Sequence, residues 1–314
     1  MKWIKRIGFP LLGIFLLLNI IAISQAYQFT HFYPNIPPAK KPDQMNFGEK
    51  ISAIFLGVHY PKSIVVDSLQ IPHESFTIKT SDDITLECWY SKAENTAKGT
   101  VIMFHGHASS KSGIIKEAEA FHHLGWNVLM TDFRAHGNSE GTVCTIGFEE
   151  AKDVKAAYDY IEVKGEKNIV LWGISLGAAT ILKSVADNNN IKPNKVILEM
   201  PFGSLPDAVK GRLRTMHLPE QPFSTLLTLW GGAEQGFWAF DMSPEEYASK
   251  LNCPVLLQWG INDQRVTETE TNTIYKNLAS HDKLMIKYAH SGHESLYKKE
   301  PEKWLATVGG FLNK

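Results

Sequence analysis

From about residue 99 onward, short apolar runs alternate with segments of helical periodicity. This alternation is typical of a parallel β-sheet wrapped by helices, because two parallel strands need a long crossover connection between them. Almost all of the runs are apolar on both faces, as strands buried between two helical layers are. The expected strands cover residues 100–106, 126–132, 168–173, 195–200, 254–260 and 283–289. The sequence therefore predicts an α/β fold with a mostly parallel central sheet flanked by helices.

Two earlier segments, 75–80 and 85–90, alternate more regularly between apolar and polar residues and flank a short Ser-Asp-Asp stretch. They predict an antiparallel hairpin at the edge of the sheet. The last expected helix begins at about Pro301, where proline suits a first helical position. The other expected helices of the core cover residues 113–125, 147–165, 175–187 and 267–280.

Composition excludes several classes of function. The chain has 314 residues, of which 44% are hydrophobic, so it can bury a full core. Its net charge of −1, with no long Lys/Arg run, gives no electrostatic footprint for nucleic acid. Cys88, Cys144 and Cys253 are far apart and lack metal-type spacing. We therefore expect a globular protein with no disulfide framework, no metal site and no nucleic-acid partner.

The N-terminus differs in kind from the rest of the chain. Lys2, Lys5 and Arg6 precede an apolar run at residues 7–23 that only Asn19 interrupts. Such a segment predicts contact with a membrane, and its basic flank is expected to stay on the cytoplasmic side. The domain that follows is then delivered to the opposite, periplasmic or extracellular side.

Residues 1–26 fit either a membrane anchor or a signal peptide. Ser24 and Ala26 occupy positions where a signal peptidase requires small residues, but the apolar run is longer than most signal sequences have. We favour an uncleaved anchor, and cleavage near Ala26 would instead give a secreted protein. Residues 27–45 are rich in proline and predict an extended linker, which places the globular domain at residues 46–314.

The pattern G-x-S-x-G, which surrounds many catalytic serines, occurs at residues 137–141 and 173–177. Only Ser175 lies between an expected strand and an expected helix, the turn that presents a nucleophile at the top of a sheet. Ser139 lies in a polar loop punctuated by glycines. The context therefore predicts Ser175 as the nucleophile.

A serine hydroxyl needs a base, and the base needs a carboxylate that holds its tautomer. In this kind of fold the order along the chain is serine, acid, histidine. Asp263 follows the fifth parallel strand and His293 follows the last one. His290 is a competitor, but Gly292 gives the loop before His293 the freedom to turn toward the serine. We therefore predict a Ser175-His293-Asp263 triad.

These residues resemble the α/β-hydrolase superfamily over about residues 75–314. The resemblance is carried by "FHGHASS", "DFRAHGNSEG", "GISLGA", "WGINDQRV" and "SGHE", each after an expected strand. The run "LEMPFGSL" and the apolar N-terminus are similar to membrane-anchored Bem46-like hydrolases and to serine aminopeptidase and monoglyceride lipase-like families. The resemblance implies an oxyanion hole made by the backbone N–H groups of His107 and Leu176. Many relatives have a small or apolar residue at the position of His107.

Two other groups of polar residues have structural interpretations. His105 and His107 could share a metal, but no further ligand cluster with suitable spacing accompanies them. Asp132 and Arg134 are expected to fix the loop that carries Ser139, because charge-assisted pairs organise such loops.

A long connection at about residues 203–251 predicts a small helical cap, since most connections have only a handful of residues. An amphipathic helix is expected at 205–218. Aromatic residues follow it, and they either form an apolar wall for an acyl group or pack the cap on the domain. They are Trp230, Phe237, Trp238 and Phe240.

We therefore expect a serine hydrolase that cleaves a carboxylic ester, with a lipid-like acyl group, and needs no cofactor. Two enzymatic alternatives remain open, a serine peptidase acting on short peptides and an acyltransferase, because both use the same acyl-enzyme. Dehalogenases and epoxide hydrolases of this fold are disfavoured, since they carry aspartate at the elbow. A non-catalytic binding protein is also disfavoured, because Ser175, Asp263 and His293 are all present.

Overall fold

The computed structural model describes residues 2–37, 40 and 44–314, and of residues 2–8 it describes the backbone only. Pro38 and Pro42 of the expected linker lie outside the described residues. So do the side chains of the basic flank, Lys2, Lys5 and Arg6.

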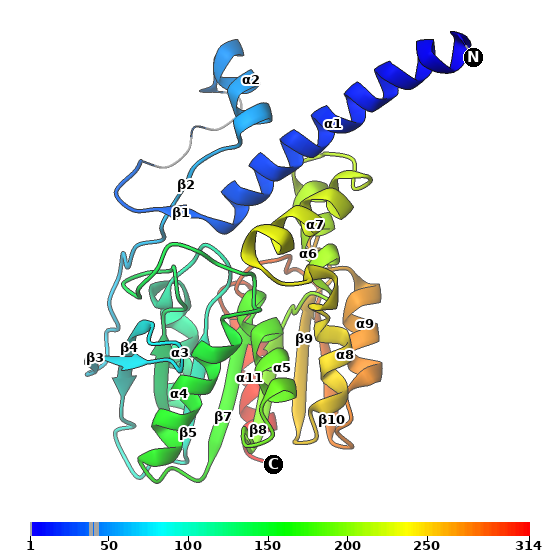
Figure 1. The fold of residues 1–314 in the computed structure, drawn as a ribbon. Helices are drawn as coiled ribbons and strands as arrows, with labels where there is room; N and C mark the ends of the chain where they lie inside the picture. Colours follow the sequence, from blue (N-terminus) through cyan, green and yellow to red (C-terminus); the bar gives the residue numbers. More distant parts are fainter. Residues whose placement is uncertain (1, 38–39, 41–43) are drawn as a thin grey trace.

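An eight-stranded sheet forms the centre of the molecule, in the spatial order β10-β9-β8-β7-β5-β6-β4-β3 (Figure 1). The strands from β5 to β10 pair in parallel, and β4 pairs antiparallel with both β6 and β3. The predicted mostly parallel sheet and its edge hairpin are therefore confirmed. The bounds are β3 (Glu74–Lys79), β4 (Thr85–Ser91), β5 (Thr100–Phe104), β6 (Asn127–Thr131), β7 (Ile169–Ile174), β8 (Lys195–Glu199), β9 (Val255–Gly260) and β10 (Lys283–Tyr288).

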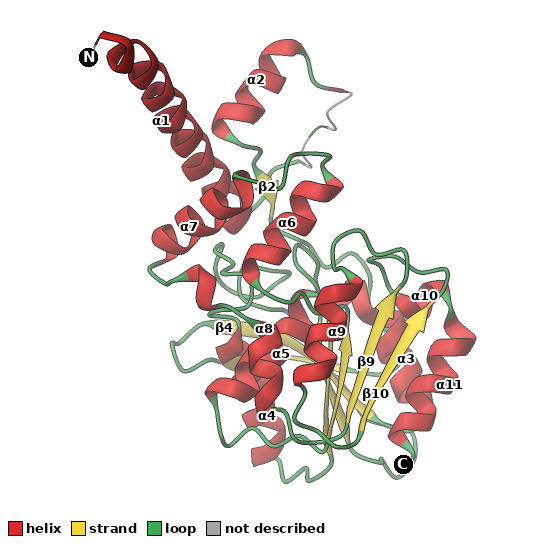
Figure 2. Ribbon diagram, turned by 90° about the vertical axis from the view of Figure 1, so that its right-hand side faces the viewer, coloured by secondary structure: helices red, strands yellow, loops and turns green. Residues whose placement is uncertain are grey.

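Helices cover both faces of the sheet (Figure 2). One face carries α4 (Ala151–Val163), α5 (Leu176–Asp187), α8 (Pro244–Tyr247) and α9 (Glu268–Asn277). The other carries α3 (Ile115–His123), α10 (Leu296–Lys299) and α11 (Pro301–Leu312). Successive residues of β5 show why such strands are apolar throughout. Ile102 and Phe104 belong to one core cluster and Val101 and Met103 to the other, and all four are fully buried.

Strand β5 marks the point where the direction of winding changes. The chain goes from β5 to β6 on one side and then returns to β7 on the other side. In an open α/β sheet, a crevice forms outside the carboxyl ends of the strands at such a switch point. The loop after β5 and the turn after β7 meet there, so the topology by itself places a binding site at this edge.

The long connection after β8 forms the expected cap. It contains α6 (Leu205–Thr215), α7 (Phe223–Gln235), two 3-10 turns, Ala239–Asp241 and Ala248–Lys250, and α8. The arrows of β9 and β10 point to the end of the molecule where α6 and α7 lie (Figure 2). Ser204 caps α6 by accepting the N–H of Asp207. The cap therefore roofs the carboxyl edge of the sheet.

Helix α1 (Lys2–Thr30) extends away from the domain, and its C-terminal part packs on the cap (Figure 1). Ala22 and Ala26 are buried in a cluster with Leu213 of α6 and Leu227 of α7. Asn19, the polar residue in the apolar run, accepts a hydrogen bond from the indole of Trp230 (2.9 Å). Between Phe9 and Thr30 the helix is long and apolar enough for a membrane span or a signal sequence.

The segment after α1 differs from the extended linker expected from residue 27. The helix continues to Thr30, and the short strand β1 (Phe32–Tyr33) pairs with β2 (Tyr60–Pro61). Phe32 is 2% exposed and donates its N–H to the carbonyl of Thr142 (2.7 Å), while the N–H of Cys144 donates to Thr30 (2.8 Å). These backbone hydrogen bonds make residues 30–33 part of the folded domain. A further helix, α2 (Phe47–Leu56), follows and contacts α1.

Candidate active site

Ser175 occupies a strained turn between β7 and α5. Its backbone has φ 54° and ψ −114°, a conformation that non-glycine residues rarely adopt. The glycines on both sides are required by close packing. A Cβ at Gly173 would lie 2.6 Å from the backbone of Gly177, and one at Gly177 would lie 2.3 Å from the carbonyl oxygen of Phe104. The pattern G-x-S-x-G at 173–177 therefore describes a turn that only glycines allow.

A chain of two hydrogen bonds links the three residues of the predicted triad. Ser175 Oγ lies 2.8 Å from His293 Nε2, and His293 Nδ1 lies 2.7 Å from Asp263 Oδ2. The other carboxylate oxygen of Asp263 accepts the backbone N–H groups of Arg265 (2.7 Å) and Val266 (2.9 Å). Because Nδ1 faces a carboxylate, it carries the proton, and Nε2 is free to accept the serine hydroxyl.

His290 does not take part in this chain. It is exposed, and its backbone N–H donates to Glu300 (2.9 Å). The structure therefore brings His293, and not His290, to Ser175.

The two backbone N–H groups expected to form an oxyanion hole flank the serine. Leu176 is the first residue of α5, where an N–H has no acceptor within the helix. His107 lies in the loop after β5, and a Cβ on its neighbour Gly106 would be 3.6 Å from Ser175 Cβ. Among the described residues, neither N–H has a hydrogen-bond acceptor. Both groups are therefore free to bind an oxygen atom of a ligand.

Two buried histidines support the loop that carries His107. His105 accepts the N–H of Phe133 (3.1 Å) and donates from Nδ1 to Gly106 (2.8 Å). His136 accepts the N–H of Ala108 at Nε2 (3.1 Å). Burial lowers the pKa of His105 to about 4 and that of His136 to about 3, so both rings are neutral and each has one accepting nitrogen. Both are structural residues, whereas the sequence analysis considered His105 only as a possible metal ligand.

The His-Gly-His stretch at 105–107 contains the two histidines that could share a metal. In the described part of the chain, no cluster of three or more His, Cys, Asp and Glu side chains is arranged to hold a metal ion. The ring of His107 instead faces the ring of Phe32, with 5.4 Å between centroids. Burial by surrounding protein, with the neighbouring His136, lowers the pKa of His107 to about 3. This imidazole is therefore an uncharged part of the site wall.

Ser139, in the second G-x-S-x-G stretch, is a structural residue. The residue is 1% exposed, and its Oγ donates to the carbonyl of Asp132 (2.6 Å) and accepts the N–H of Glu87 (2.9 Å). The carboxylate of Asp132 pairs with Lys111 (2.5 Å) and accepts the N–H of Asn138 (3.0 Å). Asp132 thus fixes the loop of Ser139, as the sequence predicted.

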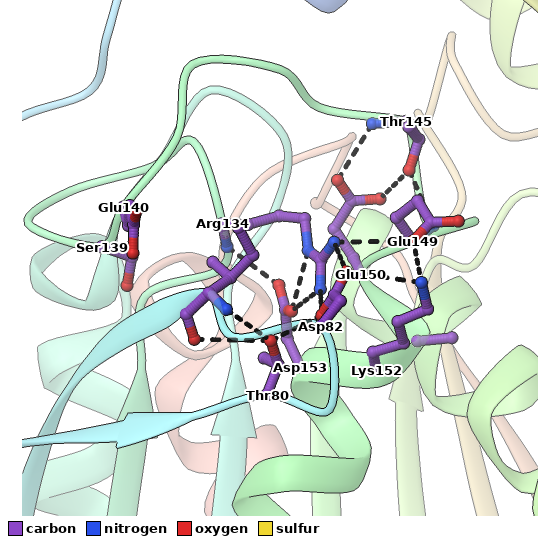
Figure 3. Close-up of polar contacts among 12 residues, drawn as sticks. Thr80, Asp82, Arg134, Ser139, Glu140, Thr145, Glu149, Glu150, Lys152 and Asp153 are labelled. Carbon is purple, nitrogen blue, oxygen red and sulfur yellow. Dashed lines mark hydrogen bonds and ion pairs between the residues drawn. The ribbon is translucent and has the colours of Figure 1, made fainter. Parts of the chain in front are cut away.

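Arg134 is the centre of a second network, shown in Figure 3. It donates to Asp153 through Nε (2.9 Å) and to Asp82 through a terminal nitrogen (2.9 Å). Farther along the same loop, the buried carboxylate of Glu150 accepts the N–H (2.9 Å) and the hydroxyl (2.8 Å) of Thr145. Since Thr145 lines the cavity described next, its hydrogen bonds to Glu150 fix one wall of the site.

A cavity of about 140 Å³ opens beside Ser175 and His293. The described residues around it include no Asp or Glu, and its walls are largely apolar. Cap residues contribute most of the apolar wall, including Leu205, Leu213, Leu227 and Phe237.

The four aromatic residues expected in the cap have different positions. Phe237 lines the cavity and stacks on Phe148, with 4.0 Å between ring centroids. Trp230 bonds to Asn19 of α1, and Trp238, next to Phe240, is 59% exposed. Phe237 therefore both lines the cavity and packs the cap on the domain, whereas Trp230 contacts α1 and Trp238 faces solvent.

Three cavity residues come from α1, and the sequence analysis missed them. They are Ala26, Phe29 and Thr30. Only two weak features of the sequence indicated that this helix packs against the domain. They are Asn19 inside the apolar run and the small residues spaced along one helical face. The N-terminal helix is thus part of the site wall as well as an apolar segment.

Comparison with known proteins gives a family match and several relatives. The model of the serine aminopeptidase family S33 matches residues 95–228. YqkD of Bacillus subtilis, an uncharacterised protein, is 28% identical over 228 residues, covering 71% of this chain and 74% of YqkD. The lysophosphatidylserine lipase ABHD12 of Danio rerio is 26% identical over 231 residues, covering 67% of this chain and 57% of the lipase. The chain thus matches little more than half of that lipase.

Solved esterases share the fold. Esterase Pf2001 of Pyrococcus furiosus has a TM-score of 0.68 and 25% identity, and the match covers 81% of this chain and 96% of the esterase. An esterase of Exiguobacterium antarcticum has a TM-score of 0.59 and 16% identity, with coverage of 77% and 100%.

Taken with the sheet order and the elbow, these matches define the class of this protein: it is an α/β-hydrolase. It is a hydrolytic enzyme, related to lipases and esterases.

Proposed function

We propose that this protein is a serine esterase that hydrolyses a carboxylic ester through a covalent acyl-enzyme. The observation that carries the proposal is the hydrogen-bonded chain from Ser175 through His293 to Asp263, which opens onto an apolar cavity. In such an arrangement, the histidine accepts the serine proton as the hydroxyl attacks the ester carbonyl.

The first half of the reaction forms the acyl-enzyme. Ser175 Oγ bonds to the carbonyl carbon while its proton moves to His293 Nε2. The N–H groups of His107 and Leu176 bind the negative oxygen of the tetrahedral intermediate. His293 then gives its proton to the leaving alcohol, and the ester C–O bond breaks.

Water completes the reaction through the same groups. His293 removes a proton from water, which attacks the acyl carbon, and the proton returns to Ser175 as the acid leaves. Asp263 remains a carboxylate that orients the ring. No cofactor enters any of these steps.

The cavity favours an acyl group of some length. Its walls include Leu205, Leu213 and Leu227, so an apolar chain would lose water contact there. A relative named as a lipase is consistent with such a substrate. Among p-nitrophenyl esters, we expect octanoate to be cleaved with a higher kcat/KM than acetate, and equal values would contradict an apolar acyl site.

The matched family model, described as a serine aminopeptidase, makes a peptidase the second candidate. An aminopeptidase must bind a protonated amino group. Around this cavity, however, the described residues include no carboxylate and two arginines, Arg212 and Arg265. Since these charges would repel an ammonium group, the cavity favours an ester substrate.

A fluorophosphonate probe tests the serine assignment. Wild type and Ser139→Ala should be labelled and Ser175→Ala should not, because the probe reacts with an activated serine. Labelling of Ser175→Ala, or none of wild type, would refute the proposed nucleophile. Ser139→Ala is the matched control, since it changes the serine of the same pattern.

We infer that α1 remains attached and anchors the hydrolase domain, with its cap at about residues 203–251, outside the cytoplasm. The packing of Ala22 and Ala26 on the cap supports retention, since cleavage after Ala26 would remove both residues. N-terminal sequencing of the purified membrane fraction tests this. A start at Met1 fits an anchor, whereas a start at Tyr27 would show a signal peptide.

A further inference from the structure

Two arginines lie at the wall of the cavity that Ser175 and His293 enter. Arg212 comes from α6 in the cap, and Arg265 comes from the loop after β9, two residues beyond Asp263. Segments far apart in the sequence thus place two guanidinium groups at one cavity.

Among the described residues, neither guanidinium has a carboxylate partner. Of the arginines whose side chains the structure describes, Arg134 is paired with Asp82 and Asp153, and Arg214 with Glu220. No Asp or Glu of the described residues lies within ion-pair distance of Arg212 or Arg265. Guanidinium groups in protein interiors and clefts are usually matched by anions, so these two stand out.

Arg212 is held in place by neutral groups. Its guanidinium lies over the rings of Phe29 (5.8 Å) and Tyr60 (5.7 Å), and one terminal nitrogen donates to the hydroxyl of Tyr60 (3.3 Å). These contacts fix the side chain at its faces and leave most of its five N–H donors free. The group is therefore positioned without being neutralised.

Arg265 is fixed through its backbone. Its N–H donates to Asp263 and its carbonyl accepts from Arg214 (3.4 Å), while its side chain makes no hydrogen bond to any described residue. Burial, and next the charge of Arg212, lower the pKa of Arg265, while the nearby Asp263 carboxylate raises it but does not cancel the shift. Both positive charges line the same cavity, so an anion bound there would be attracted by both.

We propose that Arg212 and Arg265 form an anion-binding subsite, and that the preferred substrate is an apolar acyl ester whose alcohol part carries a phosphate or carboxylate group. This inference rests on the proposed esterase function. The apolar wall takes the acyl chain, the ester carbonyl lies at Ser175, and the charged alcohol part reaches the two arginines. Guanidinium groups suit this task because their paired N–H donors match two oxygens of one anion.

The test compares esters that share an oleoyl chain and differ in the alcohol part. They are 1-oleoyl-glycerol, which is neutral, 1-oleoyl-glycerol-3-phosphate, and oleoyl lactate, which carries a carboxylate. Wild type should cleave at least one anionic ester with a kcat/KM about tenfold above the neutral ester, the size expected for charge-assisted hydrogen bonds. The better anionic ester identifies phosphate or carboxylate as the group recognised.

The variants Arg212→Gln and Arg265→Gln should each lower the ratio of anionic to neutral kcat/KM by about tenfold. Arg212→Lys should lower it less, because it keeps the charge but loses the fork of donors. Lys210→Gln is the control for net charge. Lys210 lies on the same helix but pairs with Asp207 (2.9 Å) and does not line the cavity, so the ratio should stay at the wild-type value.

The outcomes separate the two proposals. Equal rates on neutral and anionic esters in wild type, or ratios unchanged in both arginine variants, would overturn the subsite while leaving the esterase proposal intact. Absence of cleavage of every ester, together with absence of fluorophosphonate labelling at Ser175, would overturn the esterase proposal itself.

Discussion

The stretches "GNSEG" at 137–141 and "GISLG" at 173–177 follow one pattern and serve opposite purposes. Ser139 is buried, has ordinary backbone geometry and satisfies its hydroxyl on the main chain. Ser175 has a positive φ, and its hydroxyl meets His293 at a cavity. A residue pattern therefore describes backbone requirements, and the elements before and after it decide whether the serine is free to react.

Each serine also has a carboxylate nearby, and exchanging these carboxylates for amides gives the largest expected contrast. Asp263→Asn should lower kcat by about 10⁴, because an amide no longer holds His293 in the tautomer that accepts the serine proton. Asp132→Asn should instead lower the free energy of unfolding by about 3–5 kcal/mol, since it leaves buried Lys111 with only the more distant carboxylate of Glu87 (4.0 Å).

Ester hydrolysis and urea unfolding measured on both variants separate the two roles. The comparison fails if Asp132→Asn loses activity per folded molecule as strongly as Asp263→Asn does. It also fails if Asp263→Asn loses its stability and keeps its rate.

The glycines give the next contrast. A Cβ at Gly177 would press on the carbonyl of Phe104, so Gly177→Ala must displace the elbow from the loop of His107. We expect kcat/KM to fall by about 100-fold, as misplacement near 1 Å does. Gly141 has φ +90° but 3.6 Å of clearance, so Gly141→Ala should cost only about 1–2 kcal/mol of stability. Equal activity losses in the two variants would contradict this account.

The sequence predicted the features that depend on local stretches of chain and missed those that depend on contacts between distant segments. The strands, the edge hairpin and the strand-to-helix context of Ser175 are written in short stretches of chain, so periodicity and glycine positions suffice. His293 and Asp263 could be chosen because chain order and topology bring the ends of parallel strands together.

Other parts of the site depend on contacts that no local pattern records. The packing of α1 on α7 joins Asn19 to Trp230. Backbone pairing makes residues 30–33 part of the folded domain, where a proline-rich linker was expected. Arg212 appears in the sequence as one polar residue of an amphipathic helix. Only the fold shows that it shares a cavity with Arg265.

A carboxyl group beneath the elbow gives a smaller, pH-dependent contrast. Glu199 accepts the indole N–H groups of Trp172 (2.9 Å) and Trp304 (2.6 Å), and its backbone carbonyl accepts the N–H of Ser175. Burial raises the pKa of Glu199 to about 8. With its pKa raised above neutrality, this carboxyl group is protonated in the folded state at pH 7.

The raised pKa makes stability depend on pH. Between its ordinary value of 4.5 and about 8, the folded state holds a proton that the unfolded state has lost. The contribution of Glu199 to stability therefore falls as pH rises through this range and levels off above it. Glu199→Gln keeps an acceptor for both indoles and cannot ionise. Its free energy of unfolding should therefore exceed that of wild type by about 1–3 kcal/mol at pH 9 and by little at pH 5. Free energies of unfolding in urea that decline equally with pH in wild type and Glu199→Gln would contradict this.

Relief of backbone strain at the elbow gives the smallest expected effect and the most direct comparison of the two serines. Ser175→Gly removes the side chain from a conformation with φ 54°, so the free energy of unfolding should rise by about 1 kcal/mol after the entropy of glycine is offset. Ser139→Gly has no such strain to relieve and loses two hydrogen bonds, so it should lose at least about 1 kcal/mol. Thermal unfolding of both variants and wild type measures the sign of each change in stability. Opposite signs mean that the elbow holds Ser175 in a strained position for reaction, whereas a loss in both would mean that Ser175, like Ser139, stabilises the fold.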